Sequence, residues 1–189
     1  MLRDRIVRAF GFDEEVYTEV EHDTSFTRTA WLIVIVIAFL NQLSISIDLD
    51  LPNFIIGSAV GTVFRVIGFA IGAFVISWIG KTAFHADVTF QEMVRVLGLA
   101  YVFRIVGVMG IIGAVFPGLA CLLLPIAALT FIAGVIAWFF AVRQALDLDI
   151  VQTVVTVILG FIAVIALSIV ANLFLSILNI DIGTRMFII

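Results

Sequence analysis

Two arginines stand near the middle of long apolar segments, where a charged side chain is costly unless it has a structural or functional role. They are Arg65 and Arg104, each roughly 15 Å of helix rise from an end of its segment. All 14 Asp and Glu residues lie outside the apolar segments. A guanidinium group without a carboxylate must bond carbonyls, amides, water or an anion. The two arginines therefore indicate a site for an anion or a lipid headgroup, with purely structural bonding to helix carbonyls as the favoured alternative.

The residues around the two arginines nearly repeat. Val63–Gly68 reads VFRVIG and Val102–Gly107 reads VFRIVG. Because these segments are neighbours in the chain and would run antiparallel as helices, we expect the two guanidinium groups at similar depth. The polar residues of the other apolar segments, which are candidates to surround them, are Asn41, Gln42, Thr130, Ser168 and Asn172.

The sequence offers no set of residues for catalysis or metal binding. Its two histidines, His22 and His85, lie in separate segments, and its single cysteine is Cys121. No strand is predicted, so no glycine-rich phosphate loop can follow one. The formal net charge of −4 and the lack of a basic patch argue against nucleic acid. We expect no enzyme activity, no cofactor or metal, and no nucleic-acid partner.

The composition determines which elements must position the arginines. With 63% hydrophobic and 13% charged residues, the chain departs from soluble domains, which have about 45–50% apolar and 25% charged residues. Long apolar windows without polar alternation indicate membrane-spanning helices, not barrel strands. We predict an all-α integral membrane protein, a five-helix transmembrane domain over residues 29–189 after a cytoplasmic or interfacial segment at 1–28. The predicted spans are residues 29–47, 54–80, 94–116, 118–142 and 150–178.

Lys and Arg residues outside the spans or at their ends predict the orientation. The loop at 48–53 and the hairpin at 116–118 carry neither residue type, and the segment after 178 has only Arg185. The positive-inside rule therefore places the N-terminus in the cytoplasm and the C-terminus on the opposite side. The basic residues that would share the cytoplasmic side are Arg3, Arg5, Arg8, Arg28, Lys81, Arg95 and Arg143.

Two short amphipathic helices are predicted before the first span. In one, Leu2, Ile6 and Phe10 recur at helical spacing among charged residues. A second helix, from Asp13, sets Val16, Tyr17 and Val20 on one face. Either this segment lies on the membrane surface and docks partners, or it only packs beneath the bundle; the residue pattern supports both equally.

Small residues form a stripe along the second predicted span. Their spacings of four, seven and four residues place them on one narrow face of a helix, where another backbone can approach closely. We expect packing against the third span or against another chain, with Arg65 facing protein. The stripe consists of Gly57, Gly61, Gly68 and Gly72.

Several features together resemble the Yip (Ypt/Rab-interacting) domain family of five-span membrane proteins, in its short prokaryotic type. They are the lead segment with Phe12–Tyr17 (FDEEVY), five spans, the glycine-rich second span, and Trp138–Leu146 before Asp147. The resemblance implies a cytosolic N-terminus and, from eukaryotic relatives, links to prenylated GTPases, vesicle traffic and membrane curvature. The long cytosolic N-terminal domain of those relatives has no counterpart in this sequence. The resemblance assigns no residue a role.

Three functions follow as hypotheses. The first is a non-enzymatic membrane organiser or adaptor, which the resemblance favours. The second is an accessory subunit of a larger membrane complex. The third is a small anion or lipid-headgroup transporter or channel that uses Arg65 and Arg104. The partners expected are the lipid bilayer and either other membrane proteins or further copies of the chain.

Overall fold

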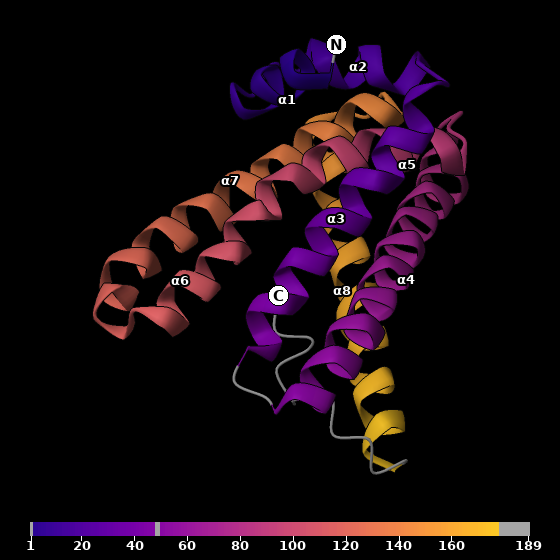
Figure 1. The fold of residues 1–189 in the computed structure, drawn as a ribbon. Coiled ribbons are helices and arrows are strands. Elements are labelled where there is room, and N and C mark those ends of the chain that lie inside the picture. The colour runs from indigo at the N-terminus through magenta and orange to yellow at the C-terminus, as the bar shows by residue number, and fades with distance from the viewer. Residues whose placement is uncertain (1, 48–49, 178–189) are drawn as a thin grey trace.

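The computed structural model describes residues 2–47 and 50–177, and every regular element in these ranges is helical (Figure 1). Four helical segments are long and apolar enough to cross a membrane, and a shorter apolar stretch, Ile150–Ala166, lies in the last helix. The all-α membrane class predicted from the composition is thus confirmed. The four candidate spans are Phe26–Ser46, Phe54–Phe84, Phe90–Val115 and Cys121–Leu146.

The elements follow one another with short connections. Two surface helices precede the bundle, and the third candidate span is built from two α-helices with a 3-10 segment between them. The elements are α1 (Leu2–Phe10), α2 (Glu15–His22), α3 (Phe26–Ser46), α4 (Leu51–Phe84), α5 (Phe90–Ala100), η1 (Tyr101–Val108), α6 (Met109–Val115), η2 (Pro117–Leu119), α7 (Ala120–Leu146) and α8 (Ile150–Ile177).

The helix α5 begins before the predicted start of the third span because its first turn is capped by polar side chains. The Thr89 hydroxyl accepts a hydrogen bond from the Glu92 backbone N–H at 3.2 Å, and the Glu92 carboxylate accepts one from the Thr89 N–H at 2.6 Å. This capping box satisfies two backbone donors that a helix start leaves unpaired. A prediction based on hydropathy alone leaves out this polar turn.

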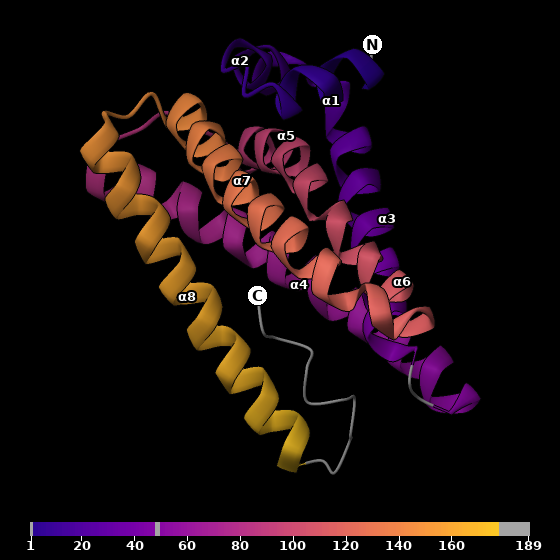
Figure 2. The ribbon, with the colours of Figure 1, turned by 90° about the vertical axis from the view of Figure 1, so that its left-hand side faces the viewer.

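The close-packed core lies toward the end of the bundle that carries α1 and α2. There α3 packs against α4 and α5, and α7 packs against α5. The fully buried side chains include Val34 on α3, Ile76 on α4, Leu97 on α5 and Ala141 on α7. Further from this end, α7 and α8 diverge from each other, as both views of the ribbon show (Figures 1 and 2).

The helices α1 and α2 lie across one end of the bundle and form what we call the cap, residues 2–25 (Figure 1). Their inner faces bury Ala9, Val16, Tyr17 and Val20. For α2 these are the positions that the helical spacing assigned to an apolar face, whereas Leu2 and Phe10 of the apolar face assigned to α1 are each 43% exposed. The α2 helix packs on α5 and α7, so the cap is seated on the bundle.

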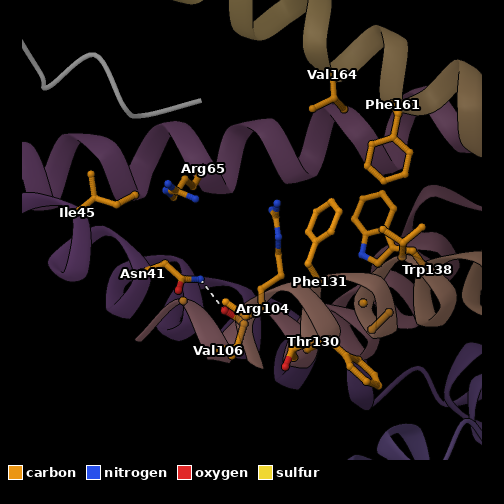
Figure 3. A pocket seen from close by; sticks show the side chains of 16 residues that line it. Asn41, Ile45, Arg65, Arg104, Val106, Thr130, Phe131, Trp138, Phe161 and Val164 are labelled. Atoms are coloured by element: carbon orange, nitrogen blue, oxygen red, sulfur yellow. Dashed lines mark hydrogen bonds between the residues drawn. The ribbon is translucent and has the colours of Figure 1, made fainter. Parts of the chain in front are cut away.

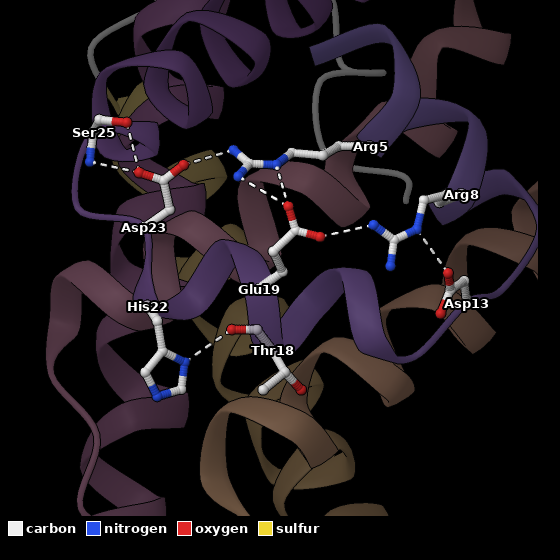
Figure 4. A network of polar contacts seen from close by, with 8 residues as sticks. All are labelled: Arg5, Arg8, Asp13, Thr18, Glu19, His22, Asp23 and Ser25. Atoms are coloured by element: carbon white, nitrogen blue, oxygen red, sulfur yellow. Dashed lines mark hydrogen bonds and ion pairs between the residues drawn. The ribbon is translucent and has the colours of Figure 1, made fainter. Parts of the chain in front are cut away.

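Ion pairs fix the two cap helices to each other (Figure 4). Arg5 pairs with Glu19 at 3.2 Å and with Asp23 at 2.7 Å, and Arg8 pairs with Glu19 and with Asp13, each at 2.7 Å. Hydrogen bonds from Ser25 and Arg5 lower the pKa of Asp23 to about 2, so this carboxylate stays charged at neutral pH. Two of the arginines counted for the orientation are therefore engaged within the cap.

Arg95 joins the cap to the bundle. From the sequence, Arg95 was counted only among the basic residues that indicate the cytoplasmic side. In the structure it is buried, with 3% of its surface exposed. Its Nε donates to the Glu21 carbonyl at 2.8 Å, Nη2 donates to the same carbonyl, and Nη1 donates to the Thr27 hydroxyl at 3.2 Å. Glu21 is in the last turn of α2, where carbonyls lack intrahelical partners. A single side chain of α5 thus caps α2 and contacts α3.

Candidate functional site

A cavity of about 340 Å³ lies among α3, α4, η1, α7 and α8 (Figure 3). Both central arginines line it, Arg65 from α4 and Arg104 from η1. Asn41 of α3 and Thr130 of α7, two of the polar candidates from the sequence, also line it. The structure therefore brings the two copies of the repeated hexapeptide, Val63–Gly68 and Val102–Gly107, to one site.

Arg65 is oriented by a buried glutamine of α3. The Nε of Arg65 donates to Gln42 Oε1 at 2.9 Å, and Gln42 is 1% exposed. Gln42 in turn packs on Gly61, where a Cβ atom would overlap the Gln42 side chain. A glycine at position 61 is thus required for the glutamine to reach Arg65. Among the described residues, the Nη atoms of Arg65 have no hydrogen-bond partner.

The backbone at Arg104 is held by Asn41. The Asn41 Nδ2 donates to the Arg104 carbonyl at 3.0 Å, and a Cβ atom at Gly107 would overlap Asn41 Oδ1. This contact lies in a 3-10 segment in the middle of a span, a geometry that often marks a functional or strained position. The Arg104 side chain lines the cavity, with its Cζ 5.3 Å from the centroid of the Tyr101 ring.

The cavity carries two positive charges and no negative one. None of the 16 described residues that line it is Asp or Glu. The Arg104 guanidinium makes no hydrogen bond to the described part of the chain and has only the ring of Tyr101 beside it. The available donors are suited to an oxyanion, because guanidinium groups match phosphate and carboxylate oxygens in geometry and charge.

The apolar wall was not foreseen from the sequence. Phe131 and Trp138 of α7 and Phe161 of α8 line the cavity, and the Trp138 and Phe161 ring centroids lie 5.7 Å apart. Aromatic residues are frequent along the whole chain, so their number alone indicates no site. The signal was positional, since Phe131 and Trp138 are seven residues apart and share one face of α7.

The other residues proposed from the sequence have different surroundings. A Cβ atom at Gly72 would lie 3.4 Å from Val164 of α8, whereas one at Gly68 would meet nothing within 4 Å. In the third span, Gly98, Gly107 and Gly110 face α3, not α4. Gly57 is buried. The side chain of Asn172 lies outside the described residues, as does that of Ser168.

Gly61→Ala is expected to lower the melting temperature in detergent, because the added methyl group displaces Gln42 from Arg65. Overpacking of this kind costs about 1–3 kcal/mol. Gly68→Ala, on the same helix but with open space at Cβ, is the matched control and should have little effect. In a Gln42→Ala background the penalty of Gly61→Ala should largely disappear, and a double-mutant cycle measures this coupling. Equal penalties in both backgrounds would contradict the assigned contact.

Within residues 2–47 and 50–177, no group of three or more His, Cys, Asp or Glu side chains could hold a metal ion. The polar side chains that line the cavity supply guanidinium, amide and hydroxyl groups.

Comparison with known protein families gives a match over most of the chain. The family model described as the Yip1 domain matches residues 13–172, a range that includes α2, all the candidate spans and every residue that lines the cavity. No curated protein and no solved structure matches the chain.

Proposed function

Since the chain belongs to the Yip1 domain family, we propose that this integral membrane protein is a non-enzymatic membrane organiser. Its cap lies in the headgroup region of one leaflet and adds apolar volume there. The positive-inside rule assigns this leaflet to the cytoplasmic side. The C-terminus is then on the opposite side, as five spans require.

The apolar edge of α1 is the observation that carries this proposal. The helix runs across the end of the bundle (Figure 1), yet Leu2, Val7 and Phe10 are 43%, 61% and 43% exposed. An amphipathic helix in the plane of a membrane surface buries such an edge below the headgroups. The ion pairs of Arg5 and Arg8 with α2 hold this edge in place.

Anchoring of the cap decides what its insertion does to the bilayer. A freely hinged helix could follow the lipid surface without bending it. The cap is instead fixed to the bundle by Arg95 and by the aromatic pair of Phe10 and Phe103, with ring centroids 4.6 Å apart. Apolar volume inserted into one leaflet at a fixed depth favours curvature of that leaflet.

Val7→Glu tests the proposal, because it places a charge on the apolar edge while leaving the ion pairs intact. Wild-type protein reconstituted at increasing density into neutral phosphatidylcholine vesicles should reduce their mean diameter, as measured by cryo-electron microscopy. Val7→Glu should abolish most of this reduction. Thr24→Glu adds the same charge to an exposed cap position outside α1 and should behave as wild type. Equal vesicle diameters with wild type and Val7→Glu would overturn the proposal.

A further inference from the structure

We propose that the cavity between η1 and α7 binds the phosphate group of an anionic phospholipid, with Arg65 and Arg104 as its ligands. This inference does not rest on the organiser role of the cap. It concerns a different part of the molecule, near the middle of two spans.

The charge of the cavity requires an anion. Two guanidinium groups share a space in which no carboxylate lies, and Gln42 satisfies only the Nε of Arg65. Burial of unpaired cations is unfavourable in low dielectric, and the penalty is offset when an oxyanion accepts charge-assisted hydrogen bonds. Both side chains line the same cavity (Figure 3), and we infer that one phosphate group accepts hydrogen bonds from both.

The walls of the cavity favour a lipid over a free anion. Beyond the arginines the lining is aromatic and aliphatic, including Phe131, Trp138 and Phe161. An inorganic phosphate would shed its water beside these rings without gaining contacts from them. A phospholipid places its acyl chains there, and burial of apolar surface adds to its binding. The cavity is lined by residues of both α7 and α8, two helices that diverge from each other in the ribbon (Figure 2).

Fluorescence quenching of Trp138 tests the proposal directly, because this residue lines the cavity. The chain has three tryptophans, so Trp31→Phe and Trp78→Phe leave Trp138 as the only emitter. The protein is reconstituted with phosphatidylglycerol or phosphatidylcholine brominated on the acyl chains, at equal mole fractions. Both lipids carry a phosphate group, but only phosphatidylcholine also carries a cation, which the two arginines repel. Brominated phosphatidylglycerol should therefore bind about tenfold more strongly.

Three variants determine whether the arginines carry this selectivity. The double variant Arg65→Gln, Arg104→Gln should bind the two lipids with equal strength. The double variant Arg3→Gln, Arg28→Gln removes the same charge from exposed positions and should retain the preference for phosphatidylglycerol. Arg65→Lys with Arg104→Lys keeps the charge without the guanidinium fork and should retain part of it. The lysine variant also serves as the test if the glutamine variant does not fold.

Two results would overturn the proposal. If Trp138 of the Arg65→Gln, Arg104→Gln variant is quenched with the same lipid selectivity as in the parent protein, Arg65 and Arg104 have only a structural role. If millimolar inorganic phosphate, at constant ionic strength, displaces brominated phosphatidylglycerol from the parent protein, the site takes free phosphate instead of lipid. Retained selectivity in the presence of phosphate, together with its loss in the glutamine variant, supports a lipid ligand.

Discussion

Arg95→Ala is expected to detach the cap from the bundle and to cost about 1–3 kcal/mol of stability, the penalty for leaving a buried hydrogen-bond acceptor unpaired, in addition to the lost packing of the arginine side chain. The substitution leaves the Glu21 carbonyl without its donors and empties a buried volume among α2, α3 and α5. Two measurements check this result. The melting temperature in detergent should fall, and trypsin should cleave at Arg28 faster than in the wild type.

The chain provides controls for this prediction. Arg28→Ala removes an exposed arginine near the same junction and should not lower the melting temperature. Arg95→Lys should be intermediate, because an ammonium group cannot reach the Glu21 carbonyl and the Thr27 hydroxyl with the fixed fork of a guanidinium. If Arg95→Ala has the same melting temperature as the wild type and its cap remains protected from trypsin, Arg95 does not anchor the cap to the bundle.

Gly98→Val is expected to have a comparably large effect, because it separates α3 from α5. A Cβ atom at Gly98 would lie 2.8 Å from the Cβ of Ala30, 3.2 Å from its Cα and 3.3 Å from its carbonyl oxygen. The obstacle is the Cβ and the backbone of Ala30, which cannot rotate away as a longer side chain can. Gly98→Ala should cost about 1–3 kcal/mol by overpacking, and the valine should exceed this.

Gly68→Val is the matched comparison for this second prediction, since a Cβ atom at Gly68 meets no neighbour within 4 Å. The expected order of melting temperatures is Gly68→Val close to wild type, then Gly98→Ala, then Gly98→Val. A detergent-stable Gly98→Val with a wild-type melting temperature would show that the close contact of α3 with α5 is not required.

Much of the fold follows from hydropathy. Long apolar runs predict the spanning helices because backbone groups in lipid must bond within their own segment. The cap helices follow from the spacing of residues such as Val16 and Val20, which the structure buries. The two central arginines stand out because a charge in an apolar run is rare.

The arrangement of the site was less accessible from the sequence. In a chain with this many apolar residues, hydropathy does not distinguish a face that meets another helix from one that meets lipid. The aromatic wall formed by Phe131, Trp138 and Phe161 could not be recognised for that reason. Arg95 was counted with the loop residues because it lies near a helix end, and its buried contacts come from segments about 70 residues earlier in the chain.

The roles proposed for the cap and for the cavity both require the chain to cross the bilayer with the cap on one side and the α6–α7 hairpin on the other. Only then do Arg65 and Arg104 lie inside the membrane. Single cysteines at Arg3, Gly118 and Asp149 in a Cys121→Ser background, labelled with a membrane-impermeant maleimide in sealed vesicles of one orientation, measure this directly. We predict that Arg3→Cys and Asp149→Cys react from the same side and Gly118→Cys only from the other. Labelling of all three from one side would contradict the account.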